Sequence, residues 1–279
     1  MLKQTTLLFI LIQTFLFSSL AQDKYQRKLT VEEWINEMVN CKEKEYKLKN
    51  AEITYDYESE NSKILKLKDN NTRYIIDCYV SIDNCKFPTT SFNVDSISFE
   101  KYVFLMNCNI NNMNMNYCQF KEGIEILWGN VGLLFFKNTT FDDVIETYEA
   151  EISLLRFDNC TFNSSKQKVK SYINIDVPGD GFKNIISIAA PNASKKINNL
   201  SLDSCIINSD SVIPVVNIML ADFNTLAFSN IDFNNAILNF ETCSIEKTFE
   251  ITECKFQRPI GMNNFDFPER GTNFHWSQI

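Results

Sequence analysis

A short pattern of apolar residues recurs along most of this chain and limits the folds that it can adopt. With Cys160 as the reference residue, apolar side chains lie five and three residues before it (Leu155, Phe157) and two after it (Phe162). Across all copies of the pattern, only Thr147 and Ser211 are not apolar at these flanking positions, so chance is a poor explanation. The thirteen reference residues are Cys85, Ile97, Cys108, Cys118, Gly129, Thr139, Ala150, Cys160, Cys205, Val216, Ile231, Cys243 and Cys254.

Each copy of the pattern predicts two short strands joined by a bend. A spacing of two places side chains on one face of a β-strand. The step of three before the reference residue would turn that residue outward in a continuous strand, so a bend is expected there. The bend positions hold residues that tolerate tight or left-handed turns, such as Asp83-Asn84 and Asp158-Asn159.

The spacing of the copies predicts a solenoid. From Ile97 to Cys160 the reference residues are alternately 11 and 10 residues apart, so two copies make a coil of 21 residues. No helical i, i+3, i+4, i+7 spacing recurs there, and a leucine-rich repeat would pair each strand with a dissimilar return segment. We predict an all-β fold, a parallel β-helix of about eight coils of ~21–23 residues, right-handed by the crossover rule.

The repeats are similar to those of a known superfamily. Residues 157–162, Phe-Asp-Asn-Cys-Thr-Phe, resemble the short repeats of the right-handed parallel β-helix, or pectin-lyase-like, superfamily, with Cys in the place that Asn often fills. The resemblance covers roughly residues 74–256. Bulky residues such as Phe92 and Phe249 distinguish the chain from stricter pentapeptide repeats. Its Asn-, Ile-, Lys- and Phe-rich composition is similar to that of secreted β-helix proteins of ciliates.

The N-terminus predicts export from the cytosol. Residues 1–21 have the features of a secretory signal peptide: Lys3, an apolar core and a small-x-small cleavage site ending at Ala21. An uncleaved membrane anchor is the alternative, although the apolar run is short for a span. We therefore expect a secreted protein, or one in the lumen of the secretory pathway, with no transmembrane segment after signal cleavage.

The repeat sets the expected domain boundaries. Residues 22–69 are expected to form an N-terminal cap over the open sheet edge, with an amphipathic helix that starts at a capping box at Thr30–Glu33. The β-helix is expected over residues 70–258. An irregular excursion is expected at 163–199, where the 45 residues from Cys160 to Cys205 are close to two coils. Residues 259–279 are expected to form a C-terminal tail or cap.

Cysteines and sequons indicate the covalent chemistry that the chain can carry. Nine cysteines in a secreted chain suggest disulfides, but seven occupy reference positions, where we expect free, buried thiols. Cys41 and Cys78 lie outside the frame and are the disulfide candidates. His275 is the one histidine and no C-x-x-C occurs, so neither a metal nor another cofactor is expected. N-glycosylation sequons occur at Asn70, Asn138, Asn159, Asn163, Asn192 and Asn199.

One outward surface is predicted to be apolar. Outward residues of a solenoid form ladders with one rung per coil. Position −2 of three successive coils holds Met106, Leu127 and Tyr148, and Phe104 and Trp128 adjoin them. Either the cap or the excursion covers this ladder, or the ladder is exposed as a platform for sugar rings or a stripe for protein docking.

The carboxylates beside this ladder give a weaker hypothesis of catalysis. Glu125 and Glu146 are expected on adjacent rungs, about 5 Å apart, a spacing similar to that of retaining glycosidases; Asp142 is a further candidate. The polysaccharide-cleaving relatives use Asp clusters with Arg or Lys bases, or a Gly-His-Gly element, which this chain lacks. The formal net charge of −8 argues against a nucleic-acid partner.

These observations favour a secreted, non-catalytic β-helix protein that binds a glycan or a protein at a cell surface or in an extracellular matrix. The alternatives are a polysaccharide lyase or glycoside hydrolase of the pectin-lyase-like fold, and a purely structural surface component.

Overall fold

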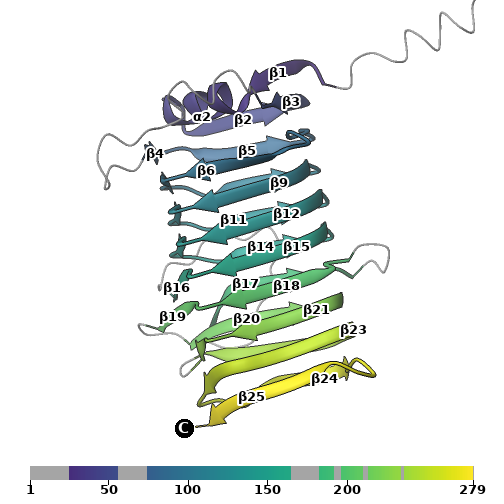
Figure 1. Cartoon of the computed structure of the whole chain (residues 1–279). Coiled ribbons are helices and arrows are strands. Elements are labelled where there is room, and N and C mark those ends of the chain that lie inside the picture. The colour runs from purple at the N-terminus through teal and green to yellow at the C-terminus, as the bar shows by residue number, and fades with distance from the viewer. Residues whose placement is uncertain are drawn as a thin grey trace, which may run out of the picture.

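The protein is a parallel β-solenoid. The structure, a computed structural model, describes residues 25–55, 74–164, 182–191, 196–209, 213–233 and 236–278. About 67% of it is strand, in about 9 turns, with one short helix. Figure 1 shows the coils stacked from the helical cap at the N-terminal end to the last strands at the C-terminal end. The prediction of an all-β parallel β-helix is confirmed.

Each coil contributes strands to three parallel faces. Face 1 holds β4 (Tyr74–Ile76), β7 (Ile97–Phe99), β10 (Gln119–Phe120), β13 (Thr140–Phe141), β16 (Thr161–Ser164), β19 (Ile206–Ser209) and β22 (Asp232–Phe233). Face 2 holds β2 (Glu45–Lys49), β5 (Tyr79–Asp83), β8 (Val103–Met106), β11 (Ile124–Leu127), β14 (Ile145–Tyr148), β17 (Phe182–Ala189), β20 (Ile213–Met219) and β24 (Gly261–Asp266). Face 3 holds β6 (Ser91–Asp95), β9 (Asn109–Asn116), β12 (Asn130–Lys137), β15 (Glu151–Asp158), β18 (Asn199–Asp203), β21 (Asp222–Ser229) and β25 (Thr272–Gln278). The long strand β23 (Ile237–Phe256) pairs with strands of all three faces.

The cap closes the N-terminal end of the core. Helix α2 (Val31–Val39) follows β1 (Arg27–Thr30), and β1 pairs with β3 (Ala51–Thr54). The predicted capping box is present: Glu33 N donates to Thr30 Oγ1 (3.1 Å), and Thr30 N donates to the Glu33 carboxylate (2.8 Å). The buried Trp34 ring lies edge-on to Phe87, with centroids 5.2 Å apart, so the helix packs on the first coil.

Paired strands extend beyond residues 70–258 at both ends. β2 and β3 already follow the repeat around Ala51, and β2 pairs with β5. At the other end, β24 and β25 pair with β23, so the expected tail contributes strands to a further partial coil. The same frame fits around Phe265, which explains why about 9 turns form rather than eight.

Two predictions about the repeat are wrong: the position of one corner and the number of coils between Cys160 and Cys205. Val216 lies in the middle of β20, and the corner falls at Leu220-Ala221, which explains why Ser211 did not fit the frame. Phe157 of β15 pairs with Leu202 of β18, so the 45 residues from Cys160 to Cys205 hold one coil and not two. The additional length falls at 165–181 and 192–195, outside the described residues.

The predicted bend is a single residue in the left-handed conformation, directly before an inward residue. Its φ lies between 49° and 58° at every such position, and this conformation returns the next side chain to the core. The first corner, between faces 2 and 3, has Asn50, Asn84, Asn107, Trp128, Glu149, Leu220, Thr242 and Asn264 there. The second corner, between faces 3 and 1, has Ser96, Tyr117, Asn138, Asn159, Ser204, Asn230 and Glu253.

The inward corner side chain also serves as a donor. Cys160 Sγ lies 3.4 Å from Phe136 O, and Cys118 Sγ lies 3.3 Å from Val94 O, each a carbonyl of the preceding coil. Thr139 Oγ1 takes the same place 3.1 Å from Met115 O. All nine cysteines are free thiols, and the seven at corners are buried, as the repeat predicts. Cys or Thr at this position therefore combines small size with a hydrogen bond between coils.

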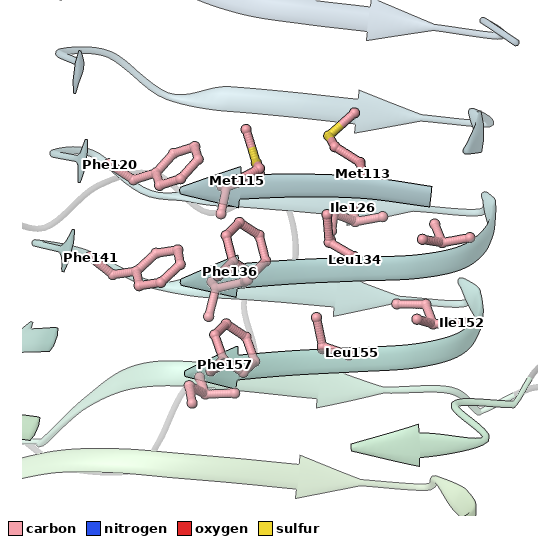
Figure 2. Close-up of a cluster of buried hydrophobic side chains, with 14 of the residues drawn as sticks. Met113, Met115, Phe120, Ile126, Leu134, Phe136, Phe141, Ile152, Leu155 and Phe157 are labelled. Carbon is pink, nitrogen blue, oxygen red and sulfur yellow. The ribbon is translucent and has the colours of Figure 1, made fainter. Parts of the chain in front are cut away.

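Aromatic side chains stack inside the solenoid. Along face 1, the centroids of Phe99, Phe120, Phe141 and Phe162 are 4.9, 5.3 and 5.1 Å apart in succession, with nearly parallel rings. A second column, which Figure 2 shows beside the first, places Phe136 and Phe157 at 5.2 Å. Because each ring contacts its equivalent in the next coil, the core holds successive coils in register.

Candidate functional site

The five residues predicted to bind ligand lie on three successive coils. Met106, Leu127 and Tyr148 pair in register across β8, β11 and β14, as a ladder of outward residues should. Leu127 is only 2% exposed, however, while Phe104, Met106 and Tyr148 are half-buried. Trp128, at the first corner, is 48% exposed and is the member of this set that presents its ring to solvent.

Glu125 and Glu146 are buried side by side on adjacent strands. They pair in register on β11 and β14, and they are 0% and 2% exposed. The Tyr102 hydroxyl donates to Glu125 Oε2 at 3.3 Å. Burial, and then the charges of Glu125 and Glu146, raise the pKa of Tyr102, so its hydroxyl keeps its proton. Burial keeps both carboxylates away from a polymeric substrate, which a catalytic acid or base must contact.

The Asp142 carboxylate is hydrogen-bonded to side chains of the neighbouring coils. Its carboxylate accepts hydrogen bonds from Gln119 Nε2 (2.7 Å) and Asn163 Nδ2 (2.6 Å), and Asn208 Nδ2 donates in turn to Asn163 Oδ1 (2.9 Å). Such a chain of amides along the solenoid axis links successive coils. In the described ranges, no group of three or more His, Cys, Asp or Glu is placed to hold a metal ion.

Trp128 follows a ladder of three asparagines at the first corner. Asn84 Nδ2 donates to Asn50 Oδ1 at 2.6 Å, and Asn107 follows one coil later. Trp128 comes next, with φ of 51°, and Glu149 follows it. Backbone hydrogen bonds fix these rungs: Asn107 N donates to Leu127 O (2.8 Å) and Trp128 N donates to Tyr148 O (3.1 Å). An aromatic residue in this conformation costs on the order of 1 kcal/mol, which Asn largely avoids.

Asn107 and Glu149 are the functional candidates that sequence reasoning missed. Asn107 is exposed and Glu149 is half-buried, and they lie on the rungs next to Trp128. Both occupy position −1, before Cys108 and Ala150, in the same half of the repeat as Trp128. The frame could therefore have found them. The corner presents an amide, an indole and a carboxylate in a row.

A groove lies elsewhere, on the second corner. It has a volume of about 470 Å³, and Ile206 is its exposed apolar residue. The described residues that line it include no aromatic ring, so it lacks the flat apolar surface that the first corner offers. They are Ser204, Cys205, Ile206, Ile207, Asn208, Asn230, Ile231, Asp232, Glu253 and Lys255.

Four of the six predicted glycosylation sites lie in the described part of the chain. Asn159 is exposed and its Nδ2 donates to Asn138 Oδ1 at 2.6 Å, one coil away. Asn163 and Asn199 are half-buried, and Asn199 Nδ2 donates to Ser153 O at 2.9 Å. Asn70 and Asn192 lie outside the described residues, as does the predicted signal peptide at 1–21.

Comparison with known proteins does not assign the chain to a family. No protein-family model, curated protein or solved structure matches it. Among the residues that the structure describes, no helix has the length and apolar character needed to cross a bilayer. The proposed function therefore rests on the geometry of the first corner, around Trp128.

Proposed function

We propose that this protein is a secreted, non-catalytic β-helix protein that binds a neutral glycan at a cell surface or in an extracellular matrix, with Trp128 as the central contact. One observation supports this most directly: an indole, 48% exposed, occupies a left-handed corner position that is Asn in the three preceding coils. Exposure and backbone strain both disfavour Trp here, and strained residues concentrate at functional sites. A ligand that covers the ring offsets this cost.

The residues around Trp128 suit a sugar. The flat indole face packs against the apolar face of a pyranose ring, and its edges leave the hydroxyl groups accessible. Asn107 supplies a donor and an acceptor on one side, and Glu149 supplies an acceptor on the other. Rungs of a parallel sheet are about 4.8 Å apart, so both side chains reach hydroxyls of a sugar stacked on Trp128.

Charge restricts the class of glycan. The chain has a formal net charge of −8, and Glu149 adds a carboxylate next to the indole. Like charges brought together at an interface reduce affinity. Sulfated or uronate-rich glycans should therefore bind weakly, and neutral glycans should bind best.

We also propose that the protein is related to the pectin-lyase-like superfamily and that it is secreted. The Asn-rich corners and the three parallel faces support a relationship to the pectin-lyase-like superfamily, and the signal-like N-terminus and sequons support secretion and glycosylation. The alternatives are a lyase or hydrolase that uses Glu125, Glu146 or Asp142, and a structural coat component. The burial of Glu125 and Glu146 argues against the enzyme.

A glycan array with the purified protein, read for bound protein and for cleaved product, tests the function. The informative variant is Trp128→Asn, because Asn suits the left-handed backbone while the indole is lost. We expect its free energy of unfolding to stay within about 1 kcal/mol of the wild type, since relief of strain offsets the lost contacts of a half-buried ring. Tyr117→Asn is the matched control, because Tyr117 is an exposed aromatic, 57%, in the same conformation at the second corner.

The outcomes separate the three hypotheses. Binding to neutral glycans that is lost in Trp128→Asn and kept in Tyr117→Asn supports the proposal. Binding that both variants retain rules out the Trp128 site. Release of cleaved sugar favours the enzyme, and absence of both binding and cleavage favours a structural role.

A further inference from the structure

Cys41 and Cys78 bring two thiols together where the cap meets the first coil. Cys41 follows helix α2, and Cys78 lies between β4 and β5. The Tyr79 N–H donates to Lys44 O at 2.9 Å, which fixes the two segments side by side. The Cys41 thiol contributes to the raised pKa of Cys78, which indicates that the two thiols are close, and both are free in this structure.

The two sulfurs differ in access. Cys41 is half-buried at the edge of the core, and its Sγ also lies 3.6 Å from Glu43 O. Cys78 is only 1% exposed. Burial, and then the neighbouring Cys41 thiol, raise the pKa of Cys78 to about 12. A soluble reagent therefore reaches Cys41 first, and Cys78 reacts only with a sulfur already beside it.

A second thiol pair inside the coils provides a contrast. Cys160 and Cys205 occupy equivalent corner positions one coil apart. Both are buried, at 1% and 2% exposure, and each also lies within 3.7 Å of a backbone carbonyl of the preceding coil. Their Cβ atoms project in parallel into a packed core, a poor geometry for a disulfide. Neither sulfur is accessible to a soluble oxidant.

We propose that Cys41 and Cys78 form a disulfide that ties the helical cap to the solenoid, with a low-molecular-weight disulfide as the oxidant. The Cys41 thiolate attacks one sulfur of the small disulfide, whose S–S bond breaks and releases one thiolate. Cys78 then gives its proton to solvent and attacks the Cys41 sulfur, which releases the second thiolate. Two cysteine thiols are oxidised, one small disulfide is reduced, and the protons convert its halves into two thiols.

The bond should have a measurable effect on the cap. It closes a loop between two parts of the chain that otherwise separate when the cap opens, and so reduces the freedom of the opened state. Oxidation should therefore raise the melting temperature by several degrees. The corner thiols stay reduced, because their burial in the core excludes the reagent.

The test treats the full chain with oxidised glutathione, then denatures it, alkylates the remaining thiols and maps the peptides by mass spectrometry. We expect two of the nine cysteines to escape alkylation, as one cross-linked peptide pair that contains Cys41 and Cys78. Cys41→Ser, a conservative change at a half-buried site, should form no cross-link and show no rise in melting temperature on oxidation.

Three results would overturn the inference: nine alkylated cysteines after oxidation, a glutathione adduct on Cys41 without a cross-link, or a cross-link between Cys160 and Cys205 instead. Because cross-linking is read without a ligand, the result is independent of the glycan proposal.

Discussion

At the scale of the residue, each corner requires different properties of two adjacent residues. The first residue must adopt a left-handed backbone, which favours Asn, and the second must be small, buried and able to donate a hydrogen bond. Asn159 and Cys160 meet both demands. Where another residue type occupies the first position, it costs stability or serves another purpose.

Among corner residues of similar size, Thr242 should lose the most stability to the left-handed backbone conformation. It is exposed, β-branched and held at φ of 54°. Thr242→Asn should raise the free energy of unfolding by about 1 kcal/mol, because Asn tolerates this conformation. Urea denaturation measures the change. Asn264→Thr, the reverse change on the next coil of the same corner, should lower stability by a similar amount, and an equal response of the two variants would contradict the explanation.

Thr139 tests the hydrogen bond between coils. It is buried, and its hydroxyl lies 3.1 Å from Met115 O. Thr139→Val keeps the shape but removes the donor, so it should destabilise the protein by about 1–2 kcal/mol. Thr139→Cys restores the donor found at the other corners and should cost clearly less. Equal destabilisation by Val and Cys in thermal or urea unfolding would show that the bond is not what the position requires.

At the scale of the element, ion pairs fasten the cap to the first coil. Glu52 of β3 accepts from Lys86 Nζ at 2.8 Å, and Lys28 of β1 lies 3.4 Å away on the other carboxylate oxygen. The hydrogen bond from Lys86 outweighs desolvation and lowers the pKa of Glu52 below its usual value of 4.5. The charged carboxylate is therefore the form that holds the cap.

This shift predicts a dependence on acid. A lowered pKa in the folded state means that the stabilisation is fully present above about pH 4.5 and is lost as the pH falls through the folded pKa. Glu52→Gln should lower the melting temperature slightly at pH 7, since exposed pairs contribute little, and should match the wild type near pH 2–3. A difference that persists in acid would show that Glu52 acts through packing.

Within the core, the stacked rings of face 1 should carry much of the stability. Phe141 is fully buried, and its centroid lies 5.3 Å from Phe120 and 5.1 Å from Phe162. Phe141→Ala should cost about 3–5 kcal/mol through the lost burial and the cavity that remains, and Phe141→Leu should cost less. Calorimetry or urea unfolding distinguishes them, and a loss below ~1 kcal/mol for Ala would show that the core collapses to fill the space.

At the scale of the whole molecule, the sequence predicts what repeats and misses what does not. The frame identifies the inward residues, the corners and the parallel stacking, because every coil must satisfy the same constraints of strand spacing and burial. It misplaces Val216 and counts one coil too many between Cys160 and Cys205, because additional residues between strands change the spacing while Phe157 still pairs with Leu202 of the next coil.

The candidate site shows the same limit. The sequence correctly predicts that Met106, Leu127 and Tyr148 pair in register on successive coils. It does not indicate that Leu127 and Glu125 are buried while Trp128 is exposed. Parity distinguishes inward from outward within one strand, whereas exposure depends on the packing of segments distant in sequence. The frame aligns Asn107, Trp128 and Glu149 at position −1, but it does not indicate how far each side chain is exposed.

The central claim, that Trp128 exists to contact a ligand, is tested most directly by tryptophan fluorescence during titration with a neutral oligosaccharide that the array identifies. A sugar stacked on the exposed indole removes water from it, so the emission should shift to shorter wavelength with saturation. The shift should persist in Tyr117→Asn and disappear in Trp128→Asn, leaving Trp34 and Trp276 unaffected. The same shift in Trp128→Asn, or bound glycan with no change in the wild-type emission, would contradict the claim.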